Sequence, residues 1–238
     1  MRIEALIFDV FGTCVDWREG VAREVERAGL PVDGHAFADH WRGRYQPAME
    51  RIRSEGRPYV DLDVLHRENL AETLAAFDVS LPDPDPDAAA DDLARAWEKL
   101  PPWPDVVPGL ARLRERRLVA PCSNGSIALM ANLARFADLR WDAVLGAGLA
   151  RDYKPKPVVY LASCAALRFA PERVMMVAAH NDDLRAARAA GLRTAFVPRP
   201  REHGPEQTSD LAPEEAWDVV ATDFADLAAR LDEIVPAD

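Results

Sequence analysis

The sequence has little cysteine and no long apolar run. Its three cysteines, Cys14, Cys122 and Cys164, are an odd number and lack the spacing of metal-ligand pairs. This favours a reduced, cytosolic setting over a disulfide scaffold. No segment approaches the roughly 20 apolar residues that a membrane-spanning helix needs. The N-terminal residues also lack the regions of a signal peptide. We therefore expect a soluble cytoplasmic protein.

Basic side chains are in the minority. Twenty-nine Lys and Arg residues stand against 40 Asp and Glu residues, which gives a formal charge of −11. Bulk electrostatics therefore argues against a nucleic acid or an anionic membrane as partner, although a local basic pocket is compatible with this charge. With 238 residues, 49% of them hydrophobic, the chain can bury a core as one large domain or two modest ones.

Short apolar runs alternate with helical patterns along most of the chain. Runs bounded by turn residues are typical of parallel strands that are buried on both faces. The alternation predicts an α/β fold with a doubly wound, Rossmann-like parallel sheet. The expected strands cover residues 3–9, 117–123, 141–146, 173–178, 192–197 and 217–221. The expected helices cover residues 107–116, 127–137, 158–167, 182–190 and 224–231.

The segment 17–100 interrupts this alternation. It contains helix patterns at 20–30, 36–53, 62–77 and 90–100, with no convincing strand between them. A polar spacer, "PDPDPD", lies at 82–87, and the segment ends in the proline-dense "PPWPDVVPG". We predict a helical cap at 17–100, inserted into a core made of residues 1–16 and 101–238.

Polar residues follow several of the predicted strands, at the edge of the sheet where ligands bind in such folds. Asp9 ends the first strand, and Ser123 and Asn124 end the second. Asp9 could cap a turn, or it could be a nucleophilic carboxylate. Ser123 and Asn124 could end a strand and start a helix, or they could offer a hydroxyl and an amide to a small anionic substrate. Lys154, in "YKPKP", could be solvated, or it could face Asp9, lower the pKa of that carboxyl and bind a substrate anion.

A further polar cluster, "AAHNDD" at 178–183, follows the fourth strand. Asn181 and Asp182 suit the start of a helix, where carboxylates favour the positive end of the helix dipole. His180 and Asp183 are three residues apart across a strand-to-helix turn, so their side chains could meet. A His oriented by a carboxylate is a general-base arrangement.

Taken in order, "FDVFGT", "CSNG", "YKPKP" and "AAHNDD" resemble the four motifs of the haloacid dehalogenase superfamily, as does a cap after the first strand. Most members are magnesium-dependent phosphotransferases with a second acid two residues after the nucleophile. Here that position is Phe11, which cannot protonate a leaving oxygen. Ala178 and Ala179 stand where phosphatases commonly have Gly-Asp, and Asp183 is retained, so one oxygen ligand for Mg²⁺ is missing.

Both departures make sense if the leaving group is a halide, which needs no proton to depart. The chain therefore resembles the 2-haloacid dehalogenase branch, and an (S)-2-haloacid dehalogenase-like hydrolase is expected. The resemblance implies that Asp9 displaces the halide of a short 2-haloalkanoic acid, and that water hydrolyses the ester to a 2-hydroxy acid. It implies no metal or other cofactor. The "HWRGRYQPAME" segment resembles the cap region in which an Arg, here Arg42, holds the halide.

The resemblance also implies roles for the site residues. Ser123, Lys154 and amides near Phe11 and Gly12 would hold the substrate carboxylate. Arg42 and Asn124 would cradle the halide, and cap aromatic side chains such as Trp41 or Tyr45 would exclude water. The expected catalytic residues are Asp9, Lys154, His180 and Asp183. The expected substrate-binding residues are Phe11, Gly12, Thr13, Arg42, Ser123, Asn124 and Tyr160.

The position of His180 departs from the branch, whose members often carry Asn there and Ser at the position of Ala178. One hypothesis is that His180, oriented by Asp183, activates water. Another is that His180 donates to a strongly solvated halide such as fluoride, and the sequence does not choose between them. Two other functions stay open: a Mg²⁺-dependent phosphatase acting on a small metabolite, and a non-catalytic relative. A homodimer is expected only because relatives often form one.

Overall fold

A computed structural model describes residues 2–82 and 84–234 of the chain. Its centre is a six-stranded sheet in the order β3-β2-β1-β4-β5-β6. Every neighbouring pair is parallel, as the apolar runs predict. The strands are β1 (Ala5–Phe8), β2 (Leu118–Ser123), β3 (Leu145–Gly146), β4 (Val174–Ala178), β5 (Arg193–Phe196) and β6 (Val219–Val220).

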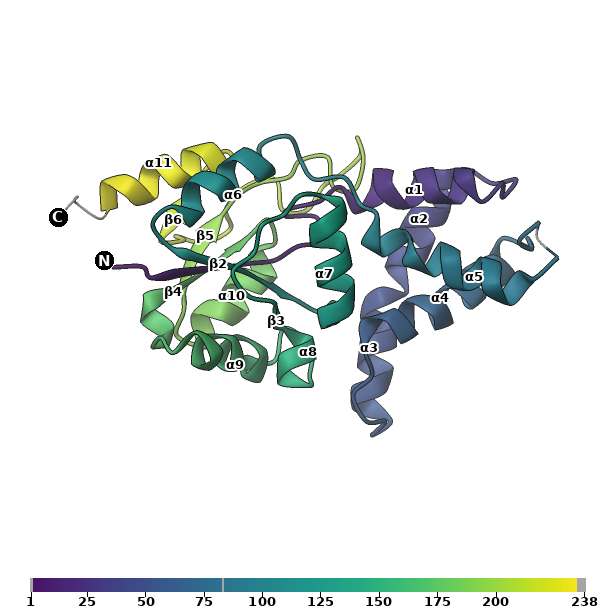
Figure 1. The fold of residues 1–238 in the computed structure, drawn as a ribbon, viewed down its shortest axis with the longest axis horizontal. Coiled ribbons are helices and arrows are strands. Elements are labelled where there is room, and N and C mark those ends of the chain that lie inside the picture. The colour runs from purple at the N-terminus through teal and green to yellow at the C-terminus, as the bar shows by residue number, and fades with distance from the viewer. Residues whose placement is uncertain (1, 83, 235–238) are drawn as a thin grey trace.

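Helices cover both faces of this sheet (Figure 1). Leu6 and Phe8 of β1 belong to one buried apolar cluster with α6, α7 and α11, whereas Ala5 and Ile7 belong to a second with α9 and α10. Successive strand residues point to opposite faces, so a strand covered on both sides must be apolar throughout. The core helices are α6 (Val106–Arg114), α7 (Ile127–Phe136), α8 (Ala147–Ala150), α9 (Pro157–Leu167), η2 (Pro171–Arg173), α10 (Asn181–Ala189) and α11 (Phe224–Ile234).

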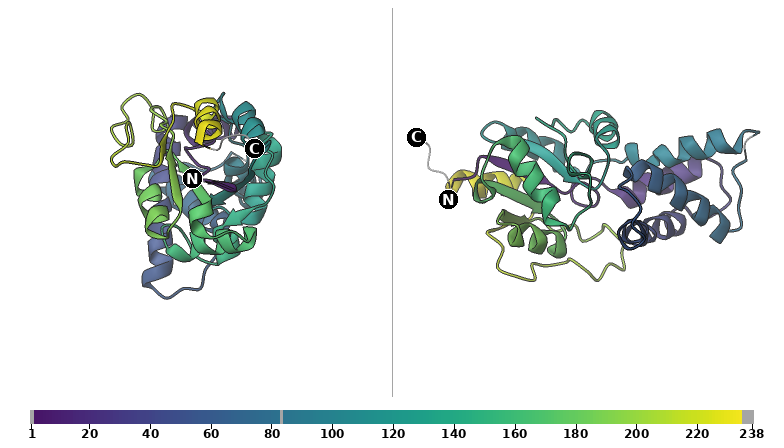
Figure 2. Two further views of the ribbon diagram at one scale, coloured as in Figure 1. Left: turned by 90° about the vertical axis from the view of Figure 1, so that its left-hand side faces the viewer. Right: turned by 90° about the horizontal axis from the view of Figure 1, so that it is seen from below.

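The segment between β1 and α6 is helical and lies at one end of the molecule, away from both termini (Figure 2). Its first helix begins where the Asp16 carboxylate accepts the N–H of Glu19, 3.0 Å away, as an N-cap does. This segment is the inserted cap, and 17–100 remain its proposed bounds. Its helices are α1 (Trp17–Arg27), α2 (Gly34–Gly43), α3 (Tyr45–Ser54), α4 (Leu62–Ala76), α5 (Pro86–Ala94) and η1 (Arg95–Glu98).

Two cap features differ from the sequence-based expectation. The pattern at 36–53 is divided at Arg44, and Pro47 lies in the first turn of α3, where a missing N–H costs no helix bond. The "PDPDPD" spacer is shorter than expected because Pro86 opens α5, with the Asp85 carboxylate accepting the N–H of Ala88. Asp83 of this spacer lies outside the described residues.

The cap is inserted after β1 and so leaves the sheet at the carboxyl ends of its strands. The chain runs outward from β1 through β2 to β3, then returns to the other side of β1 and continues through β4 to β6. Ligands bind outside the carboxyl ends of strands at such a switch point.

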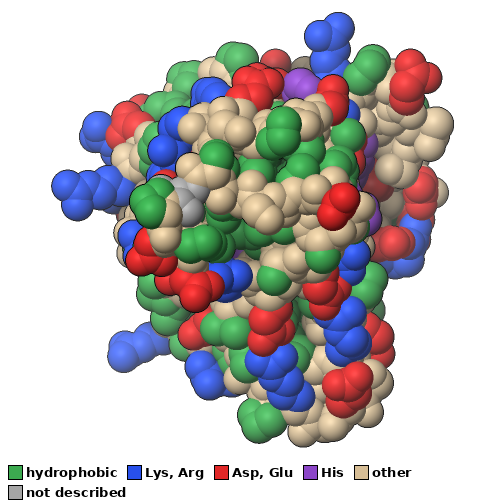
Figure 3. Space-filling model, turned by 90° about the vertical axis from the view of Figure 1, so that its right-hand side faces the viewer, with side chains coloured by type: hydrophobic (Ala, Val, Ile, Leu, Met, Phe, Trp, Pro, Cys, Tyr) green, Lys and Arg blue, Asp and Glu red, His purple; other side chains and the backbone are tan. Residues whose placement is uncertain are grey.

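Seen from the cap end, acidic, basic and hydrophobic side chains are interspersed over the surface (Figure 3). Among the described residues, no helix has the length and apolar character to cross a membrane.

Candidate active site

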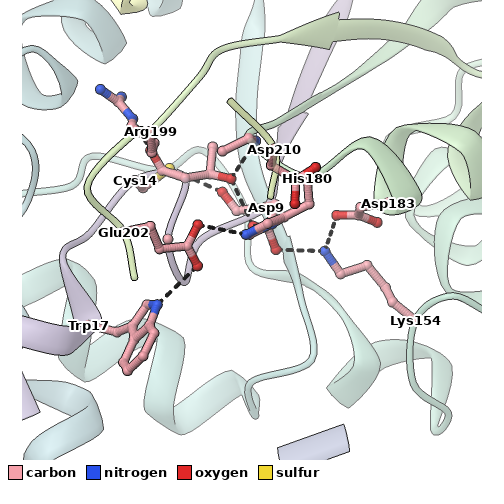
Figure 4. A network of polar contacts seen from close by, with 12 residues as sticks. Asp9, Cys14, Trp17, Lys154, His180, Asp183, Arg199, Glu202 and Asp210 are labelled. Carbon is pink, nitrogen blue, oxygen red and sulfur yellow. Dashed lines mark hydrogen bonds and ion pairs between the residues drawn. The ribbon is translucent and has the colours of Figure 1, made fainter. Parts of the chain in front are cut away.

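Asp9 follows β1 directly and has both carboxylate oxygens engaged (Figure 4). Its Oδ1 accepts a hydrogen bond from Lys154 Nζ at 2.8 Å, and its Oδ2 accepts one from Thr13 Oγ1 at 2.8 Å. The Thr13 hydroxyl in turn accepts the N–H of Ala179 at 2.9 Å, which ties the carboxylate to the end of β4. The Asp9 side chain is therefore fixed in one orientation at the switch point.

The turn after Asp9 requires glycine. Gly12 has a φ of +87°, and a Cβ at this position would overlap the carboxylate of Glu202. Any other side chain would be strained in this conformation and would push Glu202 away. The backbone of the turn therefore approaches Glu202 closely, which the sequence alone does not reveal.

Lys154 lies between two carboxylates. Its Nζ donates to Asp9 Oδ1 at 2.8 Å and to Asp183 Oδ2 at 2.6 Å, while Tyr160 donates its hydroxyl to Asp183 Oδ1 at 2.6 Å. Burial alone would lower the pKa of Lys154, but the charges of Asp183 and Asp9 raise it well above its usual value. The structure thus brings Asp9, Lys154, Asp183 and Tyr160 into one network, with Lys154 as a fixed cation.

His180 has different partners from the one expected. Its Nδ1 lies 3.1 Å from Asp9 Oδ2, and its Nε2 lies 2.8 Å from Glu202 Oε2. The predicted pairing of His180 with Asp183 is therefore wrong. His180 is extended backbone that precedes α10, whereas Asp183 lies in the first turn of that helix, so the two side chains leave in different directions.

Glu202 is the site residue that sequence reasoning missed. It is buried in the loop that follows β5, and its Oε1 accepts a hydrogen bond from Trp17 Nε1 at 3.0 Å. Trp17 is the first residue of α1, so this bond joins the cap to the core. A signal was present: the charged stretch "PRPREHG" begins soon after the fifth apolar run, at the same edge of the sheet.

These contacts set the charges of the site. Burial alone would raise the pKa of Asp9, but the Lys154 ammonium and the His180 ring hold it well below its usual range. Burial alone would lower the pKa of His180, but Glu202 and Asp9 raise it well above its usual value. His180 lowers the pKa of the buried Glu202 carboxyl in the same way. Asp9 is therefore an ionised, desolvated carboxylate, as a nucleophile requires.

The network faces a pocket of about 420 Å³ between core and cap. From the cap, Arg42 places its guanidinium carbon 4.2 Å from the Tyr45 ring centre and 5.6 Å from that of Trp17. The buried Nε of Arg42 has no hydrogen-bond partner among the described residues. The wall is formed by Asp9, Phe11, Arg42, Tyr45, Gln46, Asn124, Lys154, Pro155, His180, Asp182, Asp183, His203 and Asp210. A larger hollow of about 640 Å³ lies at the opposite edge of the sheet, by Glu4 and Leu118, far from these groups.

The remaining expected residues lie nearby. Asn124 is on the pocket wall, and its Oδ1 accepts the backbone N–H of Lys154 at 2.7 Å. Ser123 is buried and its Oγ accepts the N–H of Gly125 at 3.1 Å, so its contact with substrate stays a prediction. Trp41 is buried and donates its indole N–H to the backbone oxygen of His66.

Residues 3–191 match the family model of haloacid dehalogenase-like hydrolases. The chain belongs to this family. It is 32% identical over 199 residues to an (S)-2-haloacid dehalogenase of Xanthobacter autotrophicus, covering 83% of this chain and 76% of that protein.

Solved structures of haloacid dehalogenases agree with the fold. The crystal structure of a defluorinating L-2-haloacid dehalogenase shares 48% identity, with a TM-score of 0.92 over 96% of this chain and 95% of the other. The structure of the L-2-haloacid dehalogenase from Xanthobacter autotrophicus, with chloropropionic acid covalently bound, shares 28% identity, with a TM-score of 0.82 over 98% of this chain and 100% of the other. The predicted superfamily, branch and fold are confirmed.

Proposed function

We propose that this protein hydrolyses short 2-haloalkanoic acids to 2-hydroxy acids through an ester at Asp9, without a metal ion. The observation that carries the proposal is the pairing of an ionised, immobilised Asp9 carboxylate with Phe11 two residues later. The first is a nucleophile, and the second cannot protonate a leaving group. Relatives that are 2-haloacid or haloacetate dehalogenases indicate the class of leaving group, a halide.

In the first half-reaction, an Asp9 oxygen forms a bond to the carbon that bears the halogen, and the halide departs with the bonding electrons. Displacement is in line, so the halide leaves on the side away from Asp9. Across the pocket, Arg42 offers a positive charge among aromatic rings. Holding nucleophile and carbon in this alignment can contribute about 7–11 kcal/mol in favourable cases.

The substrate carboxylate needs donors on the core side of the pocket. Lys154 provides a buried ammonium and Phe11, on the pocket wall, would provide its backbone amide, whereas the N–H of Gly12 already donates to the backbone oxygen of Val15 at 3.1 Å. Ser123, at the end of β2, offers a hydroxyl at the same edge. We assign these groups to the substrate carboxylate, so that the halogen-bearing carbon lies next to Asp9.

In the second half-reaction, water attacks the carbonyl carbon of the Asp9 ester. His180 would accept the proton from this water, with Glu202 as the carboxylate that orients the ring. Help of this kind is typically worth about 10²–10⁴-fold in rate. His180 Nδ1 lies beside the nucleophilic carboxylate at 3.1 Å. An in-line halide would be on the opposite side of the carbon, which favours water over halide as the partner of His180.

The alternative of a Mg²⁺-dependent phosphatase fits these residues poorly. Asp9 and Asp183 are carboxylates on one side of the pocket, and the Lys154 ammonium bridges their oxygens. A divalent cation there would find these two carboxylates already paired with Lys154, and Ala178 and Ala179 supply no further side-chain oxygen ligand. Phe11 also occupies the position where a phosphatase needs its acid.

The test is halide release from chloroacetate, both 2-chloropropionate enantiomers and fluoroacetate in EDTA, beside phosphate release from phosphomonoesters with Mg²⁺. We expect metal-independent halide release and no phosphate release. Metal-dependent phosphate release without any halide release would overturn the proposal. A cytoplasmic location and a homodimer stay predictions, and sedimentation of the purified chain tests the second.

A further inference from the structure

Both ring nitrogens of His180 face carboxylate oxygens. Nδ1 lies 3.1 Å from Asp9 Oδ2, and Nε2 lies 2.8 Å from Glu202 Oε2 (Figure 4). A neutral imidazole has one N–H donor and one lone pair. In this position its lone pair would face an anionic oxygen at hydrogen-bond distance. Only the doubly protonated ring can donate to both carboxylates.

The surroundings of His180 favour the same state. Glu202 comes from the loop after β5, and Asp9 from the end of β1. Glu202 stays anionic because it accepts the Trp17 N–H and faces His203 Nε2 at 3.5 Å. The other charged or titratable groups around the pocket are Arg42, Lys154, Asp182, Asp183, His203 and Asp210. Lys154 is already paired with Asp9 and Asp183, and His203 lies farther from Glu202 than His180 does, at 3.5 Å against 2.8 Å, so His180 is the nearer cationic partner for Glu202.

A ring that carries both protons cannot accept one from water. We propose that His180 is protonated on both nitrogens in the free enzyme, and that ester formation at Asp9 releases the Nδ1 proton and makes the ring a base. This inference rests on the proposed function and adds an order of events to it. The base would then be present only in the intermediate that needs hydrolysis.

The steps balance. When the C–O bond to Asp9 forms and the carbon–halogen bond breaks, the halide takes the electron pair and Asp9 becomes a neutral ester. The Nδ1–H of His180 then faces an uncharged oxygen, and its proton passes to solvent water. Glu202 still holds the Nε2 proton.

Hydrolysis restores the starting state. The oxygen of water bonds to the ester carbonyl carbon, and the bond from that carbon to the alkyl oxygen breaks. The two protons of water end on the hydroxyl of the product and on His180 Nδ1. Asp9 is again a carboxylate beside a protonated ring. Each turnover releases one halide and one proton, and the proton leaves with the halide, before the hydroxy acid forms.

The order of release can be measured in a single turnover, with enzyme in excess over (S)-2-chloropropionate. A pH indicator in weak buffer near neutral pH follows the proton, while quenched samples give chloride and lactate. We expect about one proton per chloride in the first phase, followed by lactate with no further proton. Proton release that keeps pace with lactate and lags behind chloride would overturn the inference. Absence of chloride release would instead refute the proposed function.

Two variants sharpen this measurement. His180→Asn has no ring proton to lose, so we expect its chloride phase to release almost no proton and any proton to accompany lactate. His35→Asn removes an exposed ring on the cap surface, where it pairs with Glu19, and should keep the parent order. If His180→Asn released its proton together with chloride, as the parent does, His180 would not be the source.

Discussion

The core half and the cap half of the pocket are built differently. In the core half, Asp9, Lys154 and His180 form a continuous chain of hydrogen bonds with further buried carboxylates. In the cap half, the charge is Arg42, whose guanidinium lies over Tyr45 and whose Nε has no partner among the described residues. The core therefore fixes the groups to which we assign the making and breaking of bonds. The cap offers one cation in aromatic surroundings, which suits a departing halide.

The largest effect is expected in the core half, from Asp9→Asn. An amide has the shape of the carboxylate but cannot displace a halide, so halide release should fall by more than about 10⁴-fold. Initial rates with chloroacetate would measure this. Asp138→Asn, at an exposed loop residue that pairs with Arg140 at the surface, is the control and should change little. If the Asp9→Asn enzyme kept a tenth of the parent rate, Asp9 would not be the nucleophile.

The cap half is tested next by Arg42→Met, which keeps an apolar stem and removes the charge. We expect the rate of the halide-releasing phase to fall by about 10²–10³-fold, as for other single donors to a developing negative charge. Arg44→Met is the matched control, because Arg44 pairs with Glu72 on the outer surface of the cap. Equal effects of the two substitutions would mean that the cap merely covers the pocket.

A smaller effect, on the second half-reaction, is expected from Glu202→Gln. The uncharged side chain weakens the hydrogen bond to His180 Nε2, and a hydrogen bond to a charged group is worth about 1.5–3 kcal/mol. Ester hydrolysis should slow by roughly 10–100-fold while the chloride burst is kept. Lowering the pH should also slow ester hydrolysis, because a protonated His180 cannot accept a proton from water. The chloride burst should be kept, because the pKa of Asp9 lies well below its usual range and Asp9 stays ionised. Intact-protein mass analysis would detect the accumulated ester, and its absence in both cases would contradict the role of Glu202.

The smallest effect concerns the bond that joins the two halves. Trp17→Phe keeps an aromatic ring in the cap but removes the N–H that Glu202 accepts. We expect hydrolysis to slow by about 10-fold or less, with the pH dependence of hydrolysis shifted and the chloride burst unchanged. Trp141→Phe, an indole that packs on Phe8 in the core, controls for the loss of a large ring. A loss of burst and hydrolysis in equal measure would indicate a purely structural role for Trp17.

Much of the core half was predictable because strand ends converge at one edge of a parallel sheet. Apolar runs locate the ends, so Asp9, Asn124 and His180 could be placed together without coordinates. Spacing could not show which partner His180 has, since side-chain direction changes between the extended residue before α10 and its first turn. Glu202 was missed because it lies in a long loop without any periodicity to place it.

The cap was less predictable for a different reason. Helical periodicity indicated its helices, but the break at Arg44 and the packing of helices against each other depend on contacts between distant segments. Arg42 lies over the ring of Tyr45, which is three residues further along the chain and on the other side of that break. Only the resemblance to the family pointed to Arg42 as more than a surface charge.

The central claim is that Asp9 forms the ester and that water attacks its carbonyl carbon. A single turnover in water enriched in ¹⁸O, with enzyme in excess over (S)-2-chloropropionate, tests it directly by mass analysis of the peptide that contains Asp9. The account predicts that the label enters the Asp9 carboxylate and that the first lactate formed carries none from solvent in its new hydroxyl. Label in that hydroxyl together with an unlabelled Asp9 would mean that water displaces the halide itself, and would contradict the account.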